Sequence, residues 1–224
     1  MNARQLPLDL PHRASYAEED FLAAPANAAA SRAIRQWPGW AGKMLVLIGP
    51  PGSGKTHLAT IWARRAAAST IEADTPPEAW PAPDAAHALL IENADRIGPA
   101  EAQLFHALNI AREHGASVLI TGRTAPDSWG IRTADLLSRL RLAPLAALGE
   151  PDEALAFAVL FKLFSDRQLS VDPAVIRFVA ERIERSLGAA RAIVEAIDRE
   201  ALARGRPVTR ALAARVVGEA DIGG

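Results

Sequence analysis

One eight-residue stretch decides how this sequence folds: Gly49-Pro50-Pro51-Gly52-Ser53-Gly54-Lys55-Thr56. It fits the pattern G-x-x-x-x-G-K-[ST], in which glycines let the backbone wrap around phosphates and present its N–H groups to their oxygens. In this pattern the lysine adds a positive charge at the β- and γ-phosphates, and the threonine hydroxyl binds Mg²⁺. The stretch therefore predicts a phosphate-binding loop for ADP or ATP with Mg²⁺, and we include His57, which follows it, in the predicted nucleotide site.

The residues around this loop predict alternating strands and helices. An apolar run at 43–48 leads into the loop, and a helix is expected from Lys55 to about Ala67. Further strands are expected at 68–72, 87–91 and 117–121, and further helices at 27–36 and 99–114. Strands that alternate with helices indicate an α/β fold, with a parallel sheet flanked by helices on both faces.

The pattern changes at Gly149-Glu150-Pro151, after which no strand is predicted. Helices are expected at 152–165, 172–185 and 188–204, and a fourth begins after Thr209; Asp172 and Pro173 are typical of a helix start. We therefore expect three regions: a flexible tail at 1–13, a nucleotide-binding core at 14–149 and a small all-helical domain at 150–224.

Composition excludes several classes of protein. The 224 residues carry a net charge of −1 and no cysteine. A disulfide framework, a thiolate zinc site and a cysteine nucleophile are therefore excluded, and the near-zero charge argues against DNA binding by bulk electrostatics. No apolar run approaches the roughly 18–20 residues that span a bilayer, and the first 12 residues lack a secretory signal. We expect a cytoplasmic protein that does not contact a membrane.

A nucleotide site of this kind also needs an acid at the end of a neighbouring strand. Glu92 directly follows the run at 87–91, and we expect it to hold the Mg²⁺ water shell together with Thr56. At the next position, where the acid that activates water usually stands, the sequence has Asn93. An amide can hydrogen-bond a water but cannot accept its proton. Enzyme activity is therefore left open, and the sequence favours weak intrinsic ATP hydrolysis.

The order of phosphate-binding loop, strand-end acid and all-helical domain resembles the AAA+ ATPases. Segments 104–109, 118–121 and 136–140 are similar to the replication initiator DnaA, and the resemblance covers about residues 14–217. It implies an AAA+ P-loop core with a parallel sheet flanked by helices, followed by a small C-terminal all-α lid domain.

The resemblance also implies roles for single residues. Arg139, in Leu136-Leu137-Ser138-Arg139-Leu140, is similar to the arginine finger that acts on ATP bound to a neighbouring subunit; Arg141 is the alternative. Arg191, in Gly188-Ala189-Ala190-Arg191, is similar to the lid residue that contacts this chain's own phosphates, with Arg185 as its substitute.

Two further roles follow from the same resemblance. Thr121 fits the polar sensor position after the third strand, although the family's acidic position there holds Arg123. Asp20 and Phe21 resemble the segment that packs against adenine.

The tail has its own motif, Gln5-Leu6-Pro7-Leu8-Asp9-Leu10, which is similar to peptides that bind the DNA polymerase sliding clamp. Gln5 can place its amide in a polar subsite, while Leu8 and Leu10 fill an apolar pocket, and Leu6 is included among the expected contacts. Pro7 limits the entropy that the segment loses on binding.

A DnaA-like ATPase with a clamp-binding tail and no DNA-binding domain after the lid resembles the Hda-type regulators within the DnaA-related family. The resemblance implies that the sliding clamp and DnaA are partners, that DNA is met only through the clamp, and that DnaA-bound ATP is hydrolysed; a homo-oligomer is left open. The alternative is an ATP-driven helicase loader or remodelling AAA+ ATPase. A P-loop kinase is disfavoured because its lid is unlike the helical domain expected here.

Overall fold

The computed structural model describes residues 18–76, 80, 88–184 and 186–222. These residues form two compact units, which we describe separately: the core unit, Tyr16–Glu150, and the helical unit, which has its described part from Pro151 onward. The chain passes from one unit to the other next to the expected boundary at 149/150. The expected tail at 1–13 lies outside the described residues.

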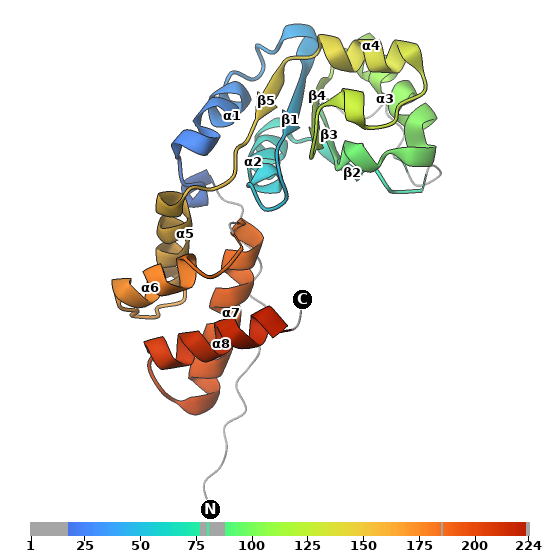
Figure 1. The fold of residues 1–224 in the computed structure, drawn as a ribbon. Coiled ribbons are helices and arrows are strands. Elements are labelled where there is room, and N and C mark those ends of the chain that lie inside the picture. The colour runs from blue at the N-terminus through green and yellow to red at the C-terminus, as the bar shows by residue number, and fades with distance from the viewer. Residues whose placement is uncertain (1–17, 77–79, 81–87, 185, 223–224) are drawn as a thin grey trace, which may run out of the picture. The chain divides into compact units, whose positions relative to one another are not determined.

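A five-stranded parallel sheet forms the centre of the core unit (Figure 1). Its spatial order is β2 (Ser69–Glu72), β3 (Ala88–Glu92), β4 (Ser117–Gly122), β1 (Met44–Ile48) and β5 (Leu145–Ala147). The predicted α/β fold class is thereby confirmed. β5 was not predicted, because a three-residue strand with a single buried side chain carries no periodic signal.

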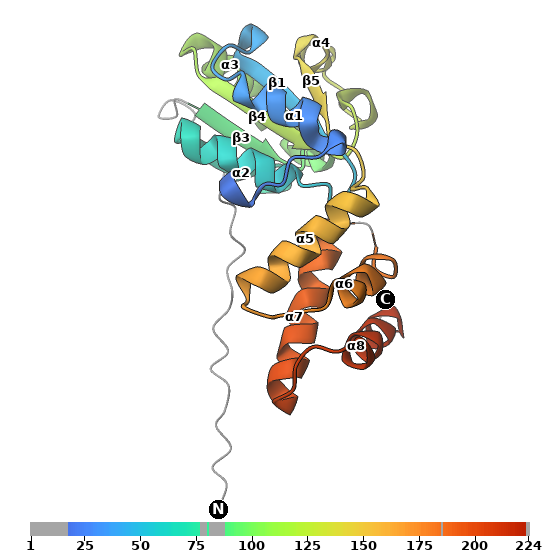
Figure 2. The ribbon, with the colours of Figure 1, turned by 90° about the vertical axis from the view of Figure 1, so that its left-hand side faces the viewer.

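Helices cover both faces of this sheet (Figures 1 and 2). Alternate strand residues point to opposite faces, so Leu45 and Leu47 pack in one cluster with α1 (Pro25–Arg35) and α2 (Lys55–Ala66). Val46 packs in the other cluster with α3 (Glu101–Glu113) and α4 (Ala134–Leu142). α4 was not predicted as a helix; it is nine residues long and buries only Leu136 and Leu140.

The helical unit consists of α5 (Glu153–Asp166), α6 (Pro173–Ala180), α7 (Leu187–Arg204) and α8 (Arg210–Ile222) (Figure 2). All four starts are capped by a side-chain oxygen. Asp152 Oδ1 accepts from Leu155 N at 2.7 Å and Asp172 Oδ1 from Ala174 N at 2.7 Å. Ser186 Oγ accepts from Ala189 N at 3.0 Å, and Thr209 Oγ1 accepts from Leu212 N at 3.3 Å. α6 ends five residues before its predicted end, because the chain must turn before Ser186 caps α7.

One cluster of buried side chains holds these helices together, including Leu160, Phe164, Val194 and Ile197. None of the helices in the described ranges combines the length and the apolar character needed to cross a lipid bilayer.

Candidate nucleotide site

The loop at 49–54 joins the end of β1 to the start of α2 with a backbone that requires glycine. Gly52 and Gly54 have φ angles of 69° and 99°, in the left-handed region that side chains disfavour. A Cβ on Gly49 would lie 2.8 Å from both the Leu148 carbonyl oxygen and Ser53 Oγ. The loop therefore forms a tight cradle at the N-terminus of a 12-residue helix, where N–H groups and the helix dipole favour an anion.

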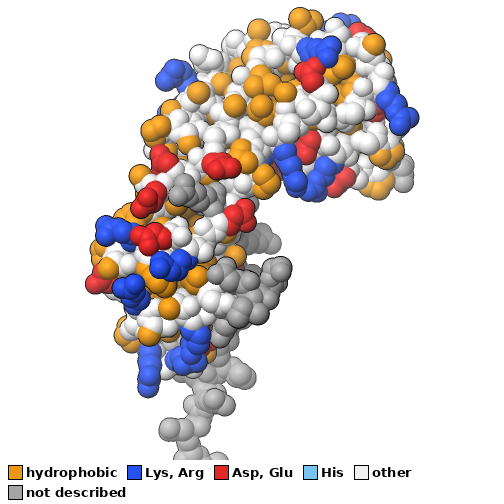
Figure 3. Space-filling model, viewed as in Figure 1, with side chains coloured by type: hydrophobic (Ala, Val, Ile, Leu, Met, Phe, Trp, Pro, Cys, Tyr) orange, Lys and Arg blue, Asp and Glu red, His pale blue; other side chains and the backbone are white. Residues whose placement is uncertain are grey.

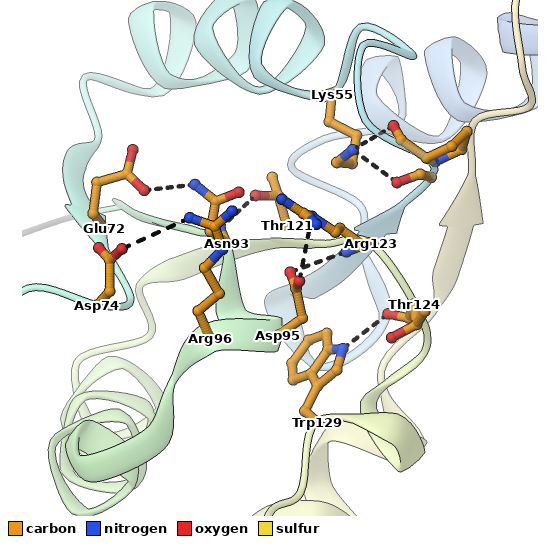
Figure 4. Close-up of polar contacts among 12 residues, drawn as sticks. Lys55, Glu72, Asp74, Asn93, Asp95, Arg96, Thr121, Arg123, Thr124 and Trp129 are labelled. Atoms are coloured by element: carbon orange, nitrogen blue, oxygen red, sulfur yellow. Dashed lines mark hydrogen bonds and ion pairs between the residues drawn. The ribbon is translucent and has the colours of Figure 1, made fainter. Parts of the chain in front are cut away.

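Lys55 holds its ammonium group at this cradle. The residue is 9% exposed, and its Nζ donates to the carbonyl oxygens of Gly49 at 2.7 Å and Pro50 at 2.8 Å (Figure 4). Burial lowers the pKa of Lys55, and the charge of Arg123 lowers it further, whereas the carboxylates of Asp95 and Glu92 act in the opposite direction. A cation is thus fixed where the predicted phosphates would bind.

Glu92 ends β3 as a buried carboxylate, 7% exposed. Burial raises its pKa, the carboxylate of Glu72 raises it further, and a hydrogen bond with the Thr56 side chain partly offsets both. Its Oε1 has no hydrogen-bond partner, and neither does the buried Ser53 Oγ in the loop. An unpaired carboxylate oxygen next to a hydroxyl fits a hydrated Mg²⁺, which takes oxygen ligands, so the residues present suit the expected metal.

Asn93 has a φ of 56°, a left-handed conformation that asparagine tolerates well. Its backbone N–H donates to Thr121 Oγ1 at 3.1 Å, so two of the predicted site residues are brought together. Its side-chain Nδ2 donates to Glu72 Oε2 at 2.7 Å. Glu72 was missed in the sequence analysis, because only the parallel pairing of β2 with β3 in the structure sets it opposite Glu92.

A second unforeseen pair lies next to Lys55. Asp95, which the sequence presents only as a loop acid after β3, accepts a hydrogen bond from the Arg123 backbone N–H at 3.0 Å. The Arg123 side chain forms an ion pair with the same carboxylate (Figure 4). An acid and a base from two strand ends therefore meet at the nucleotide site.

Phe21 and His57 also lie together in the core unit. Their ring centroids are 5.4 Å apart with an interplanar angle of 88°, and His57 is buried at the start of α2. Asp20 ends the short helical turn Glu18–Asp20 just before Phe21. The predicted contact of Asp20 and Phe21 with adenine stays a prediction.

Arg139 lies on α4 at the other end of the sheet, where the strands begin. It lines a groove of about 700 Å³ together with residues at or near the strand starts, including Met44, Val118 and Ala143. Its guanidinium donates to Asn109 Oδ1 and to Asp135 Oδ2, the latter at 2.6 Å, and lies 4.8 Å from the centroid of the Phe105 ring. With 23% of its side chain exposed, Arg139 is held by three contacts within the core unit.

The alternative finger, Arg141, is more exposed, at 56% of its side chain, and pairs with Asp127. Leu142 and Leu145 follow it, with 81% and 49% exposed. Hydrophobic side chains gather on the face of the core unit over β5 (Figure 3).

The remaining predicted residues belong to the helical unit or lie outside the described residues. Arg191 lies on α7 of the helical unit, and its contact with the phosphates stays a prediction. Its substitute Arg185 and the clamp-motif residues Gln5, Leu6, Leu8 and Leu10 lie outside the described residues.

Comparison with known proteins agrees with this geometry. A family model described as AAA domain matches residues 44–163, more than half of the chain. No curated protein matches. Among solved structures, domain III of the Thermotoga maritima replication initiation protein DnaA has a TM-score of 0.79 at 21% identity, covering 91% of this chain and 96% of that one.

Two further structures have the same fold at lower similarity. Replication initiator DnaA bound to AMPPCP and single-stranded DNA has a TM-score of 0.71 at 18% identity, covering 85% of this chain and 67% of that one. A Thermotoga maritima RuvB has a TM-score of 0.67 at 15% identity, covering 91% and 72%.

The fold and the phosphate-binding loop define a P-loop nucleotide-binding core. The chain belongs to the AAA domain family, and its fold is the AAA+ fold found in DnaA domain III.

Proposed function

We propose that this protein is an Hda-type regulator of the DnaA-related AAA+ family. It binds ADP or ATP at the loop 49–56, with Mg²⁺ held by Thr56 and Glu92, where the ion would neutralise phosphate charge. It docks on the DNA polymerase sliding clamp through residues 5–10, and its association with DNA is indirect, through the clamp. It then promotes hydrolysis of DnaA-bound ATP and so prevents over-initiation of chromosome replication.

The observation that carries this proposal is the chemistry of the position after Glu92. Three features of the loop region suit nucleotide binding: the glycine cradle, the buried Lys55 and the unpaired Glu92 oxygen. The residue next to Glu92 is an asparagine, however, with its Nδ2 engaged by Glu72. Such a site suits a protein that holds its own nucleotide and acts on that of a partner.

The place of Arg139 supports action on a partner. The loop follows the last residue of β1, whereas Arg139 lines a groove with Met44, the first residue of β1. Four residue steps of about 3.3 Å separate these ends by roughly 13 Å. A guanidinium at that end of the sheet is far from its own loop and suits the γ-phosphate of a neighbouring subunit. To bind that phosphate, Arg139 would give up its contacts with Asn109 and Asp135.

The test is single-turnover hydrolysis of ATP preloaded on DnaA, with clamp on DNA and this protein added. The wild type should stimulate hydrolysis, and Arg139→Ala should lose at least about tenfold of that stimulation, or about 1.4 kcal/mol of transition-state stabilisation. Arg139→Lys should not restore it, because an ammonium lacks the planar fork of donors. ADP binding and clamp binding should be unchanged in both variants.

Arg141→Ala is the matched control, since it removes a guanidinium from the same helix, and it should keep full stimulation. If Arg141→Ala loses stimulation while Arg139→Ala keeps it, the finger is Arg141. No stimulation by the wild type would reject the regulatory function and favour an ATP-driven helicase loader.

A further inference from the structure

The first helix of the helical unit, α5, is apolar on more than its core-facing side. Within this unit α5 packs against α6 and α7 (Figure 2), and its residues Leu160 and Phe164 lie in the shared cluster of buried side chains. Further round the helix, at spacings of three and four residues, a second set of apolar side chains forms what we call the α5 stripe: Ala154, Phe157, Ala158 and Phe161. A helix that is apolar on several sides is typical of one that is buried on several sides.

The α5 stripe is nevertheless open. Phe161 is 50% exposed, and it belongs to none of the three buried clusters in the described ranges. The outward face of α7 is polar by contrast: Glu195 and Arg199, both more than half exposed, pair across one helical turn at 3.3 Å. The α5 stripe carries no such pair. An open apolar stripe on an otherwise polar surface indicates a contact surface for another protein.

A hollow of about 410 Å³ adjoins the stripe. Its apolar lining comes from Ala154 and Phe157 on α5 and from Ala180 on α6, and the same hollow is lined by Glu153 on α5 and Arg177 on α6. Within the part of the chain that the structure describes, Glu153 and Arg177 form no ion pair, either with each other or with another residue. The hollow therefore has an apolar lining with one unpaired acid and one unpaired base beside it.

We propose that a second copy of this chain docks on the α5 stripe and its hollow, so that the protein forms a two-fold symmetric dimer through its helical units. A surface with one unpaired acid and one unpaired base is complementary to its own two-fold image. Glu153 of one copy meets Arg177 of the other, and the rotation makes the same contact a second time. Phe157 and Phe161 supply the apolar centre, and aromatic side chains are enriched in protein interfaces. This inference goes beyond the proposed function, since it uses neither the loop 49–56 nor α4 nor the motif at 5–10.

The test is analytical ultracentrifugation of the full-length protein over a range of concentrations, without nucleotide or clamp. One helix face buries less than the roughly 800 Å² per partner of a standard interface, so the wild type should dimerise with a Kd of about 10 µM. Phe161→Ser should weaken the dimer at least about tenfold, because it removes the most exposed apolar anchor. Leu202→Ser is the matched control: Leu202 is 62% exposed on α7 and lines no part of the hollow, so the Kd should not change.

Charge reversal gives a second, independent arm. Glu153→Arg and Arg177→Glu should each weaken the dimer at least about tenfold, because each variant places like charges at both symmetric contacts. An equimolar mixture of the two variants should dimerise with about the wild-type Kd, because both contacts then join opposite charges. Pairing within one chain cannot produce that result, since each variant alone carries two like charges at the hollow.

Three results would overturn the proposal. The first is a wild type that stays monomeric at about 100 µM, roughly tenfold above the expected Kd. The second is a Phe161→Ser variant that associates as the wild type does. The third is a mixture of the two charge-reversal variants that stays monomeric while circular dichroism shows both to be folded.

Discussion

The buried side chain of Glu92 bears on both the stability of the fold and the proposed binding of Mg²⁺. It lies 7% exposed at the end of β3 with one oxygen unpaired, and both burial and the Glu72 carboxylate raise its pKa. A buried carboxylate with an unpaired oxygen costs stability when it is ionised. The water shell of a bound cation would give the unpaired Glu92 oxygen the hydrogen-bond partner that it lacks.

Glu92→Gln should therefore stabilise the ligand-free protein at neutral pH by roughly 1 kcal/mol. Because the folded-state pKa of Glu92 is raised, its contribution to stability is full at acidic pH and is lost as the pH rises through that pKa. The advantage of the variant should thus shrink toward zero below about pH 4. Urea unfolding at several pH values without Mg²⁺ measures this.

The exposed Glu113→Gln is the control for that experiment and should show no such pH dependence. A Glu92→Gln variant that is less stable than the wild type at neutral pH, and equal to it only in acid, would contradict the burial argument.

Asn93 leads to a prediction about turnover. The isolated wild type should hydrolyse ATP slowly, because an amide cannot accept the proton of the attacking water. Asn93→Glu combined with Glu72→Gln should raise the rate at least about tenfold; the second change removes the carboxylate that now pairs with the Asn93 amide. Phosphate release under single-turnover conditions gives the rate.

Glu72→Gln alone serves as the reference and should leave hydrolysis slow. A fast wild-type enzyme that Asn93→Ala slows would show that Asn93 does take part in activating water.

At the scale of elements, the carboxyl end of β4 is fixed by close packing and by hydrogen bonds. The tight fit of Gly122 on Trp129 sets the course of the chain into Arg123. The same end of β4 supplies the Thr121 hydroxyl, which accepts from the backbone N–H of Asn93 just after β3. One strand end thus positions both the chain leading into Arg123 and the backbone of Asn93.

Gly122→Ala should destabilise the protein by about 1–3 kcal/mol, since its Cβ would overlap the Trp129 ring. Denaturant unfolding measures the loss. Gly149→Ala is the matched control in the same unit; its Cβ meets only ordinary contacts at 3.6 Å or more and should change stability little. Equal stability of the two variants would contradict the steric argument.

At the scale of the whole molecule, the proposed function assigns clamp docking and nucleotide binding to different parts of the chain, residues 5–10 and the loop 49–56. The predicted clamp motif at 5–10 lies outside the described residues, whereas the candidate nucleotide site is built from residues of the core unit.

Replacing Gln5, Leu8 and Leu10 together with alanine should remove clamp binding and leave thermal unfolding and ADP affinity unchanged. Co-elution with the sliding clamp on a sizing column measures binding. A control variant with Asn2 and His12 changed to alanine should still bind, since both residues flank the motif. If the triple variant co-elutes with clamp, the docking site lies elsewhere in the chain.

The sequence by itself determined the phosphate-binding loop, the sheet except β5, the covering helices except α4, and the acid at the end of β3. These features are local: a glycine pattern, an apolar run and a polar residue after it are each readable within about ten residues. The helical unit was equally readable, because caps such as Asp152 and Asp172 act on the turn that follows them.

Only the tertiary structure decided which side chains meet. The strand order β2-β3-β4-β1-β5 brings Glu72 to Asn93 and Arg123 to Asp95, across separations of 21 and 28 residues. Likewise, the contact of Arg139 with Asn109 joins α4 to α3 through two residues that are 30 positions apart. Local patterns do not contain this information, because the order of strands in a sheet is set by how the whole core packs.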